Sequence, residues 1–406
     1  MAPAATAPKP LDTPNPAVRP RRILVRLPNW VGDVVMATPL LRVLREHWPA
    51  AAIVAEGKPF LEDLLAGLPT IDEFLPDPGT GWGAVRERAR RLATKDFDLA
   101  VLLPDSPRSA LGPFLARIPN RIGYSRDPLR RFFLTHPLKP PMRDGKRIPI
   151  PMPERYLALA RALSSESNAA EGGVSDLSAS REFATPPVEL AVSPIDTARV
   201  RDMLKDQGVD PDARFIVGAP GANFGSSKLY PISSFAAACD GMSKKFGLAV
   251  VLAPAPAEVD LALDVAAHMK HPPVVLDDPP TSLGELKSLI SLSSLIFSND
   301  TGPRHMAVAL GTPTVVTMGP TDHRHTDYQL EYQRVLREDV ECAPCHEKEC
   351  PIDHRCMTRL SPSRVISAAE ELLAAPSNIP VHRTEHDANS LSLDRSPGTD
   401  PQEKTP

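Results

Sequence analysis

The 406-residue sequence contains no apolar run that approaches the roughly 20 residues a membrane-spanning helix needs. Its first 20 residues lack the apolar segment of a secretory signal and contain six prolines. The formal net charge of -4 gives no general attraction for nucleic acid. Five cysteines in a chain of this length do not predict a disulfide framework. We therefore expect a cytoplasmic protein without a transmembrane segment and without a nucleic-acid partner.

A dinucleotide-binding fingerprint is missing as well. In nicotinamide-dependent oxidoreductases the first strand of a Rossmann domain is followed by Gly-x-Gly-x-x-Gly. Here the first predicted strand, Ile23–Val25, is followed by Leu27–Gly32, whose sequence is LPNWVG. The sequence thus argues against an enzyme that transfers hydride.

What the sequence does contain is a repeated alternation of short apolar runs with helical patterns. Hydrophobic residues make up 42% of the chain, which is enough for the cores of two ordinary domains. We predict helices over 58–65, 82–94 and 364–374, a capped helix start at Ser282, and strands at 23–25, 51–55, 74–75, 99–103, 215–219, 248–252, 274–276, 295–298 and 314–318. This alternation predicts an α/β protein with two Rossmann-like halves and an active site between them.

Composition suggests where the domains begin and end. We predict a disordered tail over 1–20, a first domain over 21–163, a flexible insertion or linker over 164–190, a second domain over 191–376, and a disordered tail over 377–406. The linker and the tails are poor in apolar residues and cannot bury a core.

The stretch Arg22–Trp48 joins a buried strand to a helical pattern and places Asp33 between them. In an open α/β sheet the carboxyl ends of the strands border the ligand site, so Asp33 lies where chemistry usually takes place. The alternative is that Asp33 only caps the following helix, because Asp is a preferred N-cap residue. This stretch alone leaves both interpretations open.

Two loops of the second half have the composition of phosphate-binding turns. In 220–228 (PGANFGSSK), small residues allow close approach of a ligand, and Lys228 supplies positive charge. In 298–306 (SNDTGPRHM), Asp300 would cap a helix whose first amides hold a pyrophosphate, and His305 would add a donor. Two such loops fit a nucleotide diphosphate donor. The alternatives are an ordinary turn with an exposed lysine, and a packed, hydrogen-bonded histidine.

As a set, these motifs resemble glycosyltransferase family 9, the lipopolysaccharide heptosyltransferases, and the Pro28–Asp33 motif PNWVGD is most similar to the heptosyltransferase II branch. The resemblance covers roughly residues 22–375, and further matching segments are Leu103–Ser106, Ile118–Tyr124, Glu154–Tyr156 and Gly319–Thr321. Three places depart from the family pattern: Tyr230 stands where the family often has Trp, Asp105 replaces an Asn, and Ala253–Glu258 replaces a Gly-rich turn.

The resemblance implies a GT-B fold, in which two Rossmann-like domains face each other across a cleft. It implies an inverting transfer of L-glycero-D-manno-heptose from ADP-heptose to heptosyl-Kdo2-lipid A, the inner core of lipopolysaccharide, with no cofactor required. Asp33 matches the general base of the family and Lys228 its donor-phosphate lysine. The other residues that we assign to donor binding are Gly221, Asp300, Thr301, Gly302, His305 and, for the ribose hydroxyls, Glu258.

The acceptor would be bound by the first domain. Our candidate acceptor-binding residues are Asn29, Trp30, Arg121 and Arg155. The stretch 117–147 contains nine Lys and Arg residues against two acids, Asp127 and Asp144. Such a stretch would attract an acceptor that carries carboxylates and phosphates, and would hold the enzyme at the anionic face of the inner membrane. The alternative is a solvated basic loop.

Four of the five cysteines form a cluster: Cys342, Cys345, Cys350 and Cys356. Their number suggests a structural zinc site or an iron–sulfur ligand set. The spacing lacks a second Cys-x-x-Cys pair, so the prediction favours structural cysteines and no metal. Cys239 is expected to be a buried small apolar residue.

Two other functions fit parts of the pattern. A family-9 transferase with a different nucleotide sugar or acceptor would share the fold and the phosphate contacts. A non-catalytic protein could use the cysteine cluster alone, but the set of Asp33, Lys228 and Asp300 argues against it.

Overall fold

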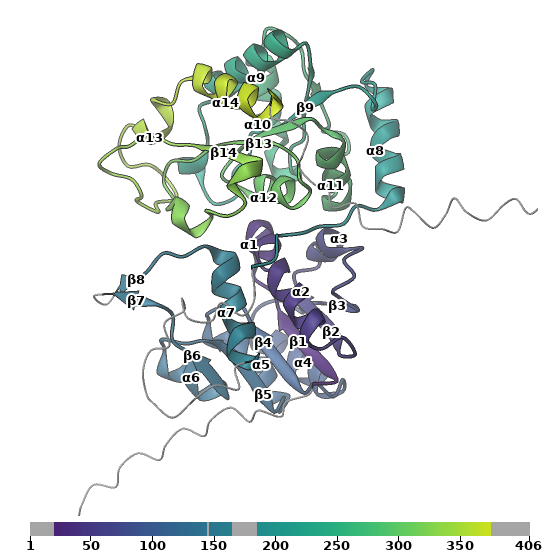
Figure 1. Ribbon diagram of the computed structural model, residues 1–406, viewed down its shortest axis with the longest axis vertical. Helices are drawn as coiled ribbons and strands as arrows, with labels where there is room; N and C mark the ends of the chain where they lie inside the picture. Colours follow the sequence, from purple (N-terminus) through teal and green to yellow (C-terminus); the bar gives the residue numbers. More distant parts are fainter. Residues whose placement is uncertain (1–19, 144–145, 165–184, 375–406) are drawn as a thin grey trace, which may run out of the picture.

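The computed structural model describes residues 20–143, 146–164 and 185–374, and these form two α/β halves stacked one above the other (Figure 1). The predicted tails lie outside the described residues except for Pro20, and so does 165–184 of the predicted linker. Among the described residues, no helix combines the length and apolar character needed to cross a bilayer.

The N-terminal half is a six-stranded parallel sheet in the order β3-β2-β1-β4-β5-β6. Its strands are β1 Arg22–Arg26, β2 Ala52–Gly57, β3 Glu73–Pro76, β4 Leu99–Leu102, β5 Asn120–Tyr124 and β6 His136–Leu138. Its helices are α1 Val31–Met36, α2 Thr38–His47, α3 Leu61–Leu65, α4 Trp82–Ala93, α5 Pro107–Leu115, α6 Pro128–Phe133 and α7 Met152–Ser164. A small hairpin of β7 Met142–Arg143 and β8 Lys146–Arg147 precedes α7.

The C-terminal half repeats this architecture with the strand order β11-β10-β9-β12-β13-β14, again all parallel. Its strands are β9 Phe215–Ala219, β10 Ala249–Leu252, β11 Val274–Val275, β12 Leu295–Asn299, β13 Thr314–Thr317 and β14 Gln333–Leu336. Its α-helices are α8 Pro194–Asp206, α9 Ile232–Phe246, α10 Val259–His268, α11 Leu283–Leu292, α12 Gly302–Ala309, α13 Arg355–Thr358 and α14 Pro362–Ala374. Short 3-10 turns are η1 Ser226–Lys228, η2 Pro256–Glu258, η3 His323–His325 and η4 Leu330–Tyr332.

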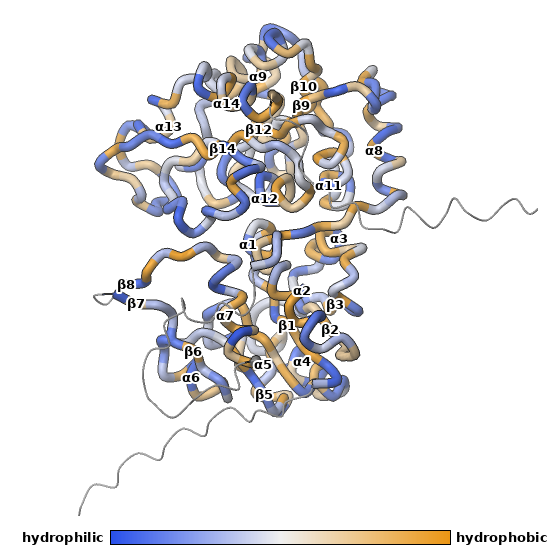
Figure 2. Tube along the Cα trace, viewed as in Figure 1, coloured by the Kyte–Doolittle hydropathy of each residue, from blue (hydrophilic) through white to orange (hydrophobic). Residues whose placement is uncertain are grey.

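The predicted strands are confirmed, and the runs Ile23–Val25 of β1 and Phe215–Ala219 of β9 are apolar (Figure 2) because helices cover both faces of these central strands. The predicted capping box is also present, since Ser282 accepts a hydrogen bond from the amide of Glu285 at the start of α11. The helix predicted over 58–65 is shorter than expected and begins at Leu61.

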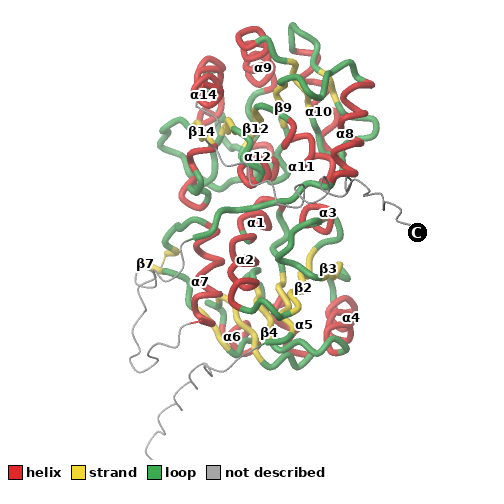
Figure 3. The backbone as a smooth tube through the Cα atoms, turned by 45° about the vertical axis from the view of Figure 1, so that its right-hand side comes forward, coloured by secondary structure: helices red, strands yellow, loops and turns green. Residues whose placement is uncertain are grey.

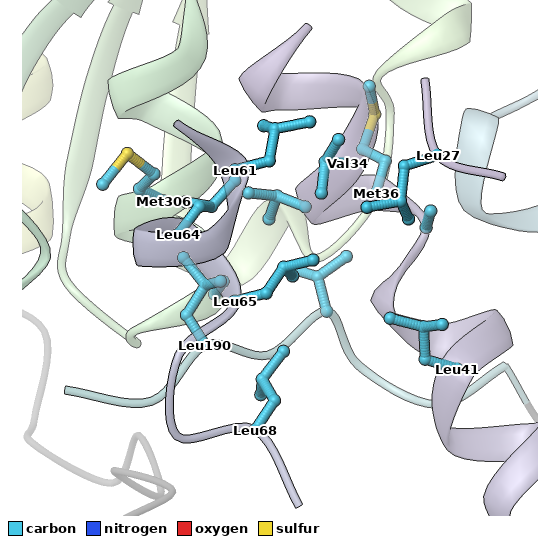
Figure 4. Packing of buried hydrophobic residues seen from close by; sticks show 14 of the residues in the cluster. Leu27, Val34, Met36, Leu41, Leu61, Leu64, Leu65, Leu68, Leu190 and Met306 are labelled. Carbon is cyan, nitrogen blue, oxygen red and sulfur yellow. The ribbon is translucent and has the colours of Figure 1, made fainter. Parts of the chain in front are cut away.

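The two halves share one hydrophobic core. Buried residues of α1 and α3 pack in a single cluster with Met306 of α12 (Figure 4). Leu190, on the segment that enters the C-terminal half, belongs to the same cluster. The prediction of a flexible linker is therefore wrong for its last residues, because Val188 and Leu190 are buried and the amide of Val188 donates to Gln329.

Helices α1 and α12 lie side by side at the junction between the halves, as two views show (Figures 1 and 3). Each follows the carboxyl end of a central strand, β1 for α1 and β12 for α12. The carboxyl ends of the central strands of the two sheets thus point at each other. In open α/β sheets, ligands bind at the carboxyl ends of the strands.

Candidate active site

Asp33 is presented to the junction by the first turn of α1. The helix begins at Val31 with Trp30 as its N-cap, so Asp33 is the third helical residue. No capping hydrogen bond from a side chain is present at this end of α1. The interpretation of Asp33 as an N-cap is therefore wrong, because the helix starts two residues earlier.

The environment of Asp33 favours a proton acceptor. Burial raises the pKa of its carboxyl to about 6, against opposing effects of the cations Lys228 and Arg155. Across the described residues no hydrogen bond or ion pair holds the carboxylate of Asp33. A half-buried carboxylate with open hydrogen-bonding capacity can accept a proton from a ligand at near-neutral pH.

Lys228 faces Asp33 from the C-terminal half and is held by Asp300. Its ammonium donates to the carboxylate Oδ2 of Asp300 at 2.7 Å and to the backbone oxygen of the same residue at 2.9 Å. Asp300 also accepts from Arg304 at 2.7 Å and from the hydroxyl of Thr321 at 2.8 Å. Burial alone would raise the pKa of Asp300, but these cations outweigh it and hold the pKa below its usual value.

These contacts correct the expected role of Asp300. The N-cap of α12 is Thr301, and Asp300 uses both carboxylate oxygens on cations and on Thr321 instead of on helix amides. The sequence analysis missed Arg304, which is fully buried and binds Asp300 from one turn further along α12. This ion pair could have been predicted from the spacing, because Asp and Arg four residues apart in a helical stretch lie on one face.

The two predicted phosphate loops are joined by Asn299, which the sequence analysis did not single out. Its side-chain amide donates to the carbonyl of Pro220 at 2.6 Å, and its carbonyl accepts from the amide of Tyr230 at 3.0 Å. The residue is fully buried. This bridge fixes the loop 220–228 against the end of β12, so that Lys228 and Asp300 meet.

His305 of α12 is buried against the N-terminal half. Its Nδ1 is 2.6 Å from the hydroxyl of Tyr328, and the two rings are stacked. Burial and the neighbouring Arg304 hold the pKa of His305 well below its usual value, so the ring is neutral at physiological pH. A Cβ on Gly32 would lie 2.5 Å from Cδ2 of His305, which shows how closely α1 approaches this ring. The packed, hydrogen-bonded alternative for His305 describes this geometry.

Glu258 and Gly221 also meet. The carboxylate of Glu258 fills the space where a Cβ on Gly221 would stand, and it accepts a hydrogen bond from the amide of Ala255 at 3.4 Å. Burial raises the pKa of Glu258. A carboxylate beside a glycine loop can accept hydrogen bonds from vicinal hydroxyl groups.

On the N-terminal side, Arg155 connects Asp33 to a pocket of about 540 Å³. Its guanidinium donates to Asp105 at 2.7 Å and lies 4.6 Å from the ring centre of Tyr124. Asp105 and Tyr124 line the pocket together with Arg126 and Arg147, among others. Asp105 thus holds both Arg155 and Arg147.

The remaining acceptor-binding candidates lie in different parts of the N-terminal half. Asn29 and Trp30 are exposed at the start of α1, next to Asp33. Arg121 lies near the N-terminal end of β5, away from the junction. Its guanidinium donates to the carbonyls of Phe133 and Ile118. The structure therefore brings Asn29, Trp30 and Arg155 to the site but not Arg121.

The segment 342–356, which contains four of the cysteines, contacts the lysine loop at Ser227 through a backbone carbonyl and a histidine side chain. The amide of Ser227 donates to the carbonyl of Lys348 at 3.0 Å, and the imidazole Nε2 of His354 is 2.7 Å from the carbonyl of Ser227. All five cysteines are free thiols, and within the described ranges no set of three or more suitable side chains is arranged to hold a metal ion. Cys239 is fully buried, as predicted.

Comparisons with known proteins agree with this geometry. The family model for glycosyltransferase family 9 (heptosyltransferase) matches residues 85–355. Lipopolysaccharide heptosyltransferase 2 of Salmonella typhimurium is 28% identical over 364 residues, which cover 87% of this chain and 99% of that protein.

Solved structures show the same architecture. The chain is similar to the Escherichia coli ADP-heptose lps heptosyltransferase II, with a TM-score of 0.69 and 26% identity over 87% of this chain and 98% of the other. It is also similar to a glycosyl transferase family 9 protein from Veillonella parvula, with a TM-score of 0.71 and 22% identity over 87% and 97% of the two chains. The predicted GT-B fold is thereby confirmed.

Proposed function

The chain belongs to glycosyltransferase family 9, the heptosyltransferases, and on that premise we propose that it transfers L-glycero-D-manno-heptose from ADP-heptose to the heptosyl-Kdo2-lipid A inner core of lipopolysaccharide. The relatives named as heptosyltransferase 2 support the second heptose as the one transferred. The similarity to an ADP-heptose-dependent enzyme supports the donor.

The observation that carries the catalytic proposal is the carboxylate of Asp33. It stands at the junction of the two sheets with a pKa raised to about 6, opposite the Lys228–Asp300 pair. A general base needs a pKa close to the working pH and free access to the proton that it removes.

The proposed reaction is a displacement with inversion at the anomeric carbon. The acceptor hydroxyl oxygen forms a bond to that carbon, and the bond from the carbon to the diphosphate oxygen breaks. Asp33 takes the hydroxyl proton, and ADP leaves with the electron pair of the broken bond. Lys228 and the first amides of α12 at Thr301 and Gly302 stabilise the charge on the leaving diphosphate.

We assign the rest of the donor site on the same basis. We assign Asp300 and the packed, neutral His305 to the surroundings of the heptose and the diphosphate, and Glu258 beside Gly221 to the ribose hydroxyls. Lys228 shares its charge between Asp300 and the bound diphosphate. This scheme uses no metal ion or other cofactor.

The acceptor side of the proposal uses Asn29 and Trp30, which precede the first turn of α1, and Arg155, which influences the pKa of Asp33 from α7. An acceptor built on lipid A is anchored in a membrane, so the enzyme would work in the cytoplasm, at the inner-membrane face. We assign Arg155 to a carboxylate or phosphate of the inner core, which it would share with Asp105, because guanidinium groups bind such anions in a bidentate manner.

The test is release of ADP by the purified chain with ADP-heptose, in the presence and absence of heptosyl-Kdo2-lipid A. Parallel reactions contain UDP- and GDP-linked sugars. We expect nucleotide release only when ADP-heptose and the acceptor are both present. Acceptor-dependent release from another nucleotide sugar would overturn the donor assignment and favour a different family-9 transferase.

A further inference from the structure

Helices α5 and α6 carry large apolar side chains on the outside of the N-terminal half. The exposed fractions are 68% for Phe132, 57% for Leu129 and 48% for Leu115. Phe114 and Phe133 lie beside them, with ring centres 5.1 Å apart, and Phe132 is 5.5 Å from Phe114. The three phenylalanine rings are thus in mutual contact, and Leu115 and Leu129 stand near them on α5 and α6; we call these five residues the aromatic face. Singly scattered apolar residues are ordinary on a protein surface, but a contiguous aromatic group of this kind marks an interaction site.

Most charges close to the aromatic face in the sequence are positive. Exposed cations stand just after α5 and just before α6, at Arg117 and Arg126, and Arg108, Lys139 and Arg143 are exposed elsewhere on the same stretch of chain. Among the described residues of 106–143 the single acid is Asp127, and its carboxylate is engaged by the amide of Leu129 at the start of α6. An exposed apolar surface with cations at the ends of its helices complements a lipid surface with anionic headgroups.

The aromatic face also adjoins the acceptor side of the site. Ser125, Arg126 and Asp127 line the 540 Å³ pocket and lead directly into α6. From that pocket, Asp105 and Arg155 connect to Asp33. A saccharide that rises from a membrane in contact with α6 would therefore meet the pocket before it meets the base.

We propose that the aromatic face is a membrane-docking surface, on which Leu129 and Phe132 enter the interfacial layer of an anionic phospholipid membrane while the surrounding arginines bind headgroups. This inference rests on the proposed function, because it assigns the surface that brings the enzyme to a lipid-linked acceptor. It names the partner, a bilayer that contains anionic phospholipid.

The first experiment is co-sedimentation of the full chain with vesicles, without any substrate. One vesicle preparation contains phosphatidylethanolamine and phosphatidylglycerol, and the other contains phosphatidylcholine alone. The test variant is Leu129→Ser/Phe132→Ser. The matched control is Ile195→Ser/Leu263→Ser, whose apolar side chains are 66% and 42% exposed on α8 and α10 of the other half. Thermal unfolding of both variants verifies that they are folded.

We expect the parent chain to bind the anionic vesicles and to be released by salt. The test variant should partition at least about tenfold more weakly, because two apolar side chains no longer enter the bilayer. The control variant should bind like the parent. Failure of the parent to bind, equal binding by the test variant, or a loss of self-association in the test variant without a loss of vesicle binding would overturn the proposal.

A second measurement separates this inference from the proposed function. Heptose transfer is measured with the acceptor embedded in anionic vesicles and with a deacylated, water-soluble acceptor. The test variant should lose transfer to the embedded acceptor and keep transfer to the soluble one. If the parent transfers no heptose to either acceptor while the vesicle results hold, the proposed function fails and the docking surface stands.

Discussion

Asp33 owes its proposed role to neighbours from distant parts of the chain. Arg155 on α7, Lys228 after β9 and Asp300 after β12 all influence the pKa of its carboxyl, yet burial dominates and raises that pKa to about 6. The stretch around Asp33 alone left both the functional and the N-cap interpretation open. The backbone excludes the N-cap interpretation, because Trp30 and not Asp33 precedes the first turn of α1.

The first prediction concerns the pH dependence of transfer. Asp33 acts only as the carboxylate, and its pKa of about 6 lies above the usual value for aspartate. The rate at low substrate concentration, kcat/KM, should therefore be level above pH 7 and fall roughly tenfold for each pH unit below about 6. His305 cannot produce this limb, because its pKa is held well below its usual value.

The pH profile needs a measurement of ADP affinity at each pH as its control, so that weak donor binding is not mistaken for a protonated base. A rate that stays constant down to pH 4.5, or that rises on acidification, would mean that Asp33 is not the group that accepts the proton.

At the scale of elements, the site depends on how closely α1 and α12 pack. Gly32 faces the side chain of His305, and Gly302 faces the side chain of Val31, so each helix start packs directly against a side chain of the other. Neither contact could be predicted from the sequence, because the two helices are far apart in the chain. No pattern in the sequence indicates which helices of the two halves pack together. The loops themselves and their places after β1, β9 and β12 were predictable.

The second prediction tests this approach with Gly32→Ala. The added Cβ would stand 2.5 Å from Cδ2 of the buried His305, so either the His305 ring, which is held against Tyr328, or the backbone of α1 must shift. We expect a destabilisation of about 1–3 kcal/mol, as for other overpacked sites, and a loss of transfer of at least tenfold. Chemical denaturation and the ADP-release assay measure the two effects.

Gly83→Ala is the matched control, because a Cβ at that position on α4 would contact nothing within 4 Å. It should leave transfer unchanged and stability within about 1 kcal/mol of the parent. Equal behaviour of Gly32→Ala and Gly83→Ala would show that the approach of α1 to α12 does not matter for the site.

The whole molecule is held together by a core that continues from one half to the other and by a buried lysine. Lys287 of α11 is 1% exposed and donates to the carbonyls of Leu64 and Ala66 at 3.0 and 3.2 Å. Those carbonyls end helix α3 of the other half, where a cation is favourable. Burial nevertheless lowers the pKa of Lys287 to about 8.

The third prediction is that Lys287→Met weakens the junction. Two helix-end carbonyls lose their partner, which should cost about 1–3 kcal/mol of unfolding free energy. Lys244→Met, at an exposed position of α9, should change stability by less than about 0.5 kcal/mol. The parent should unfold in one transition because of its shared core. Two separate transitions in the parent, or no effect of Lys287→Met, would contradict the account of the junction.

The repeated alternation of strands and helices was sufficient to predict two Rossmann-like halves, because periodicity reports directly on which faces are buried. It did not predict that Val188 and Leu190 are packed, since the polar composition around them dominates that stretch. It also did not predict the place of Arg121. A match to a family segment identifies a residue such as Arg121, but it does not show at which end of the strand the side chain lies or what the side chain contacts.

The most direct test of the central claim is acceptor-dependent release of ADP from ADP-heptose by Asp33→Asn, measured beside ADP affinity. The exposed Asp202→Asn on α8 is the control. Loss of the base should reduce turnover by at least about a hundredfold while ADP affinity stays within about threefold of the parent, because the proposed diphosphate contacts lie on the other half. Turnover within tenfold of the parent, or an equal loss of ADP affinity, would contradict the assignment of Asp33 as the base.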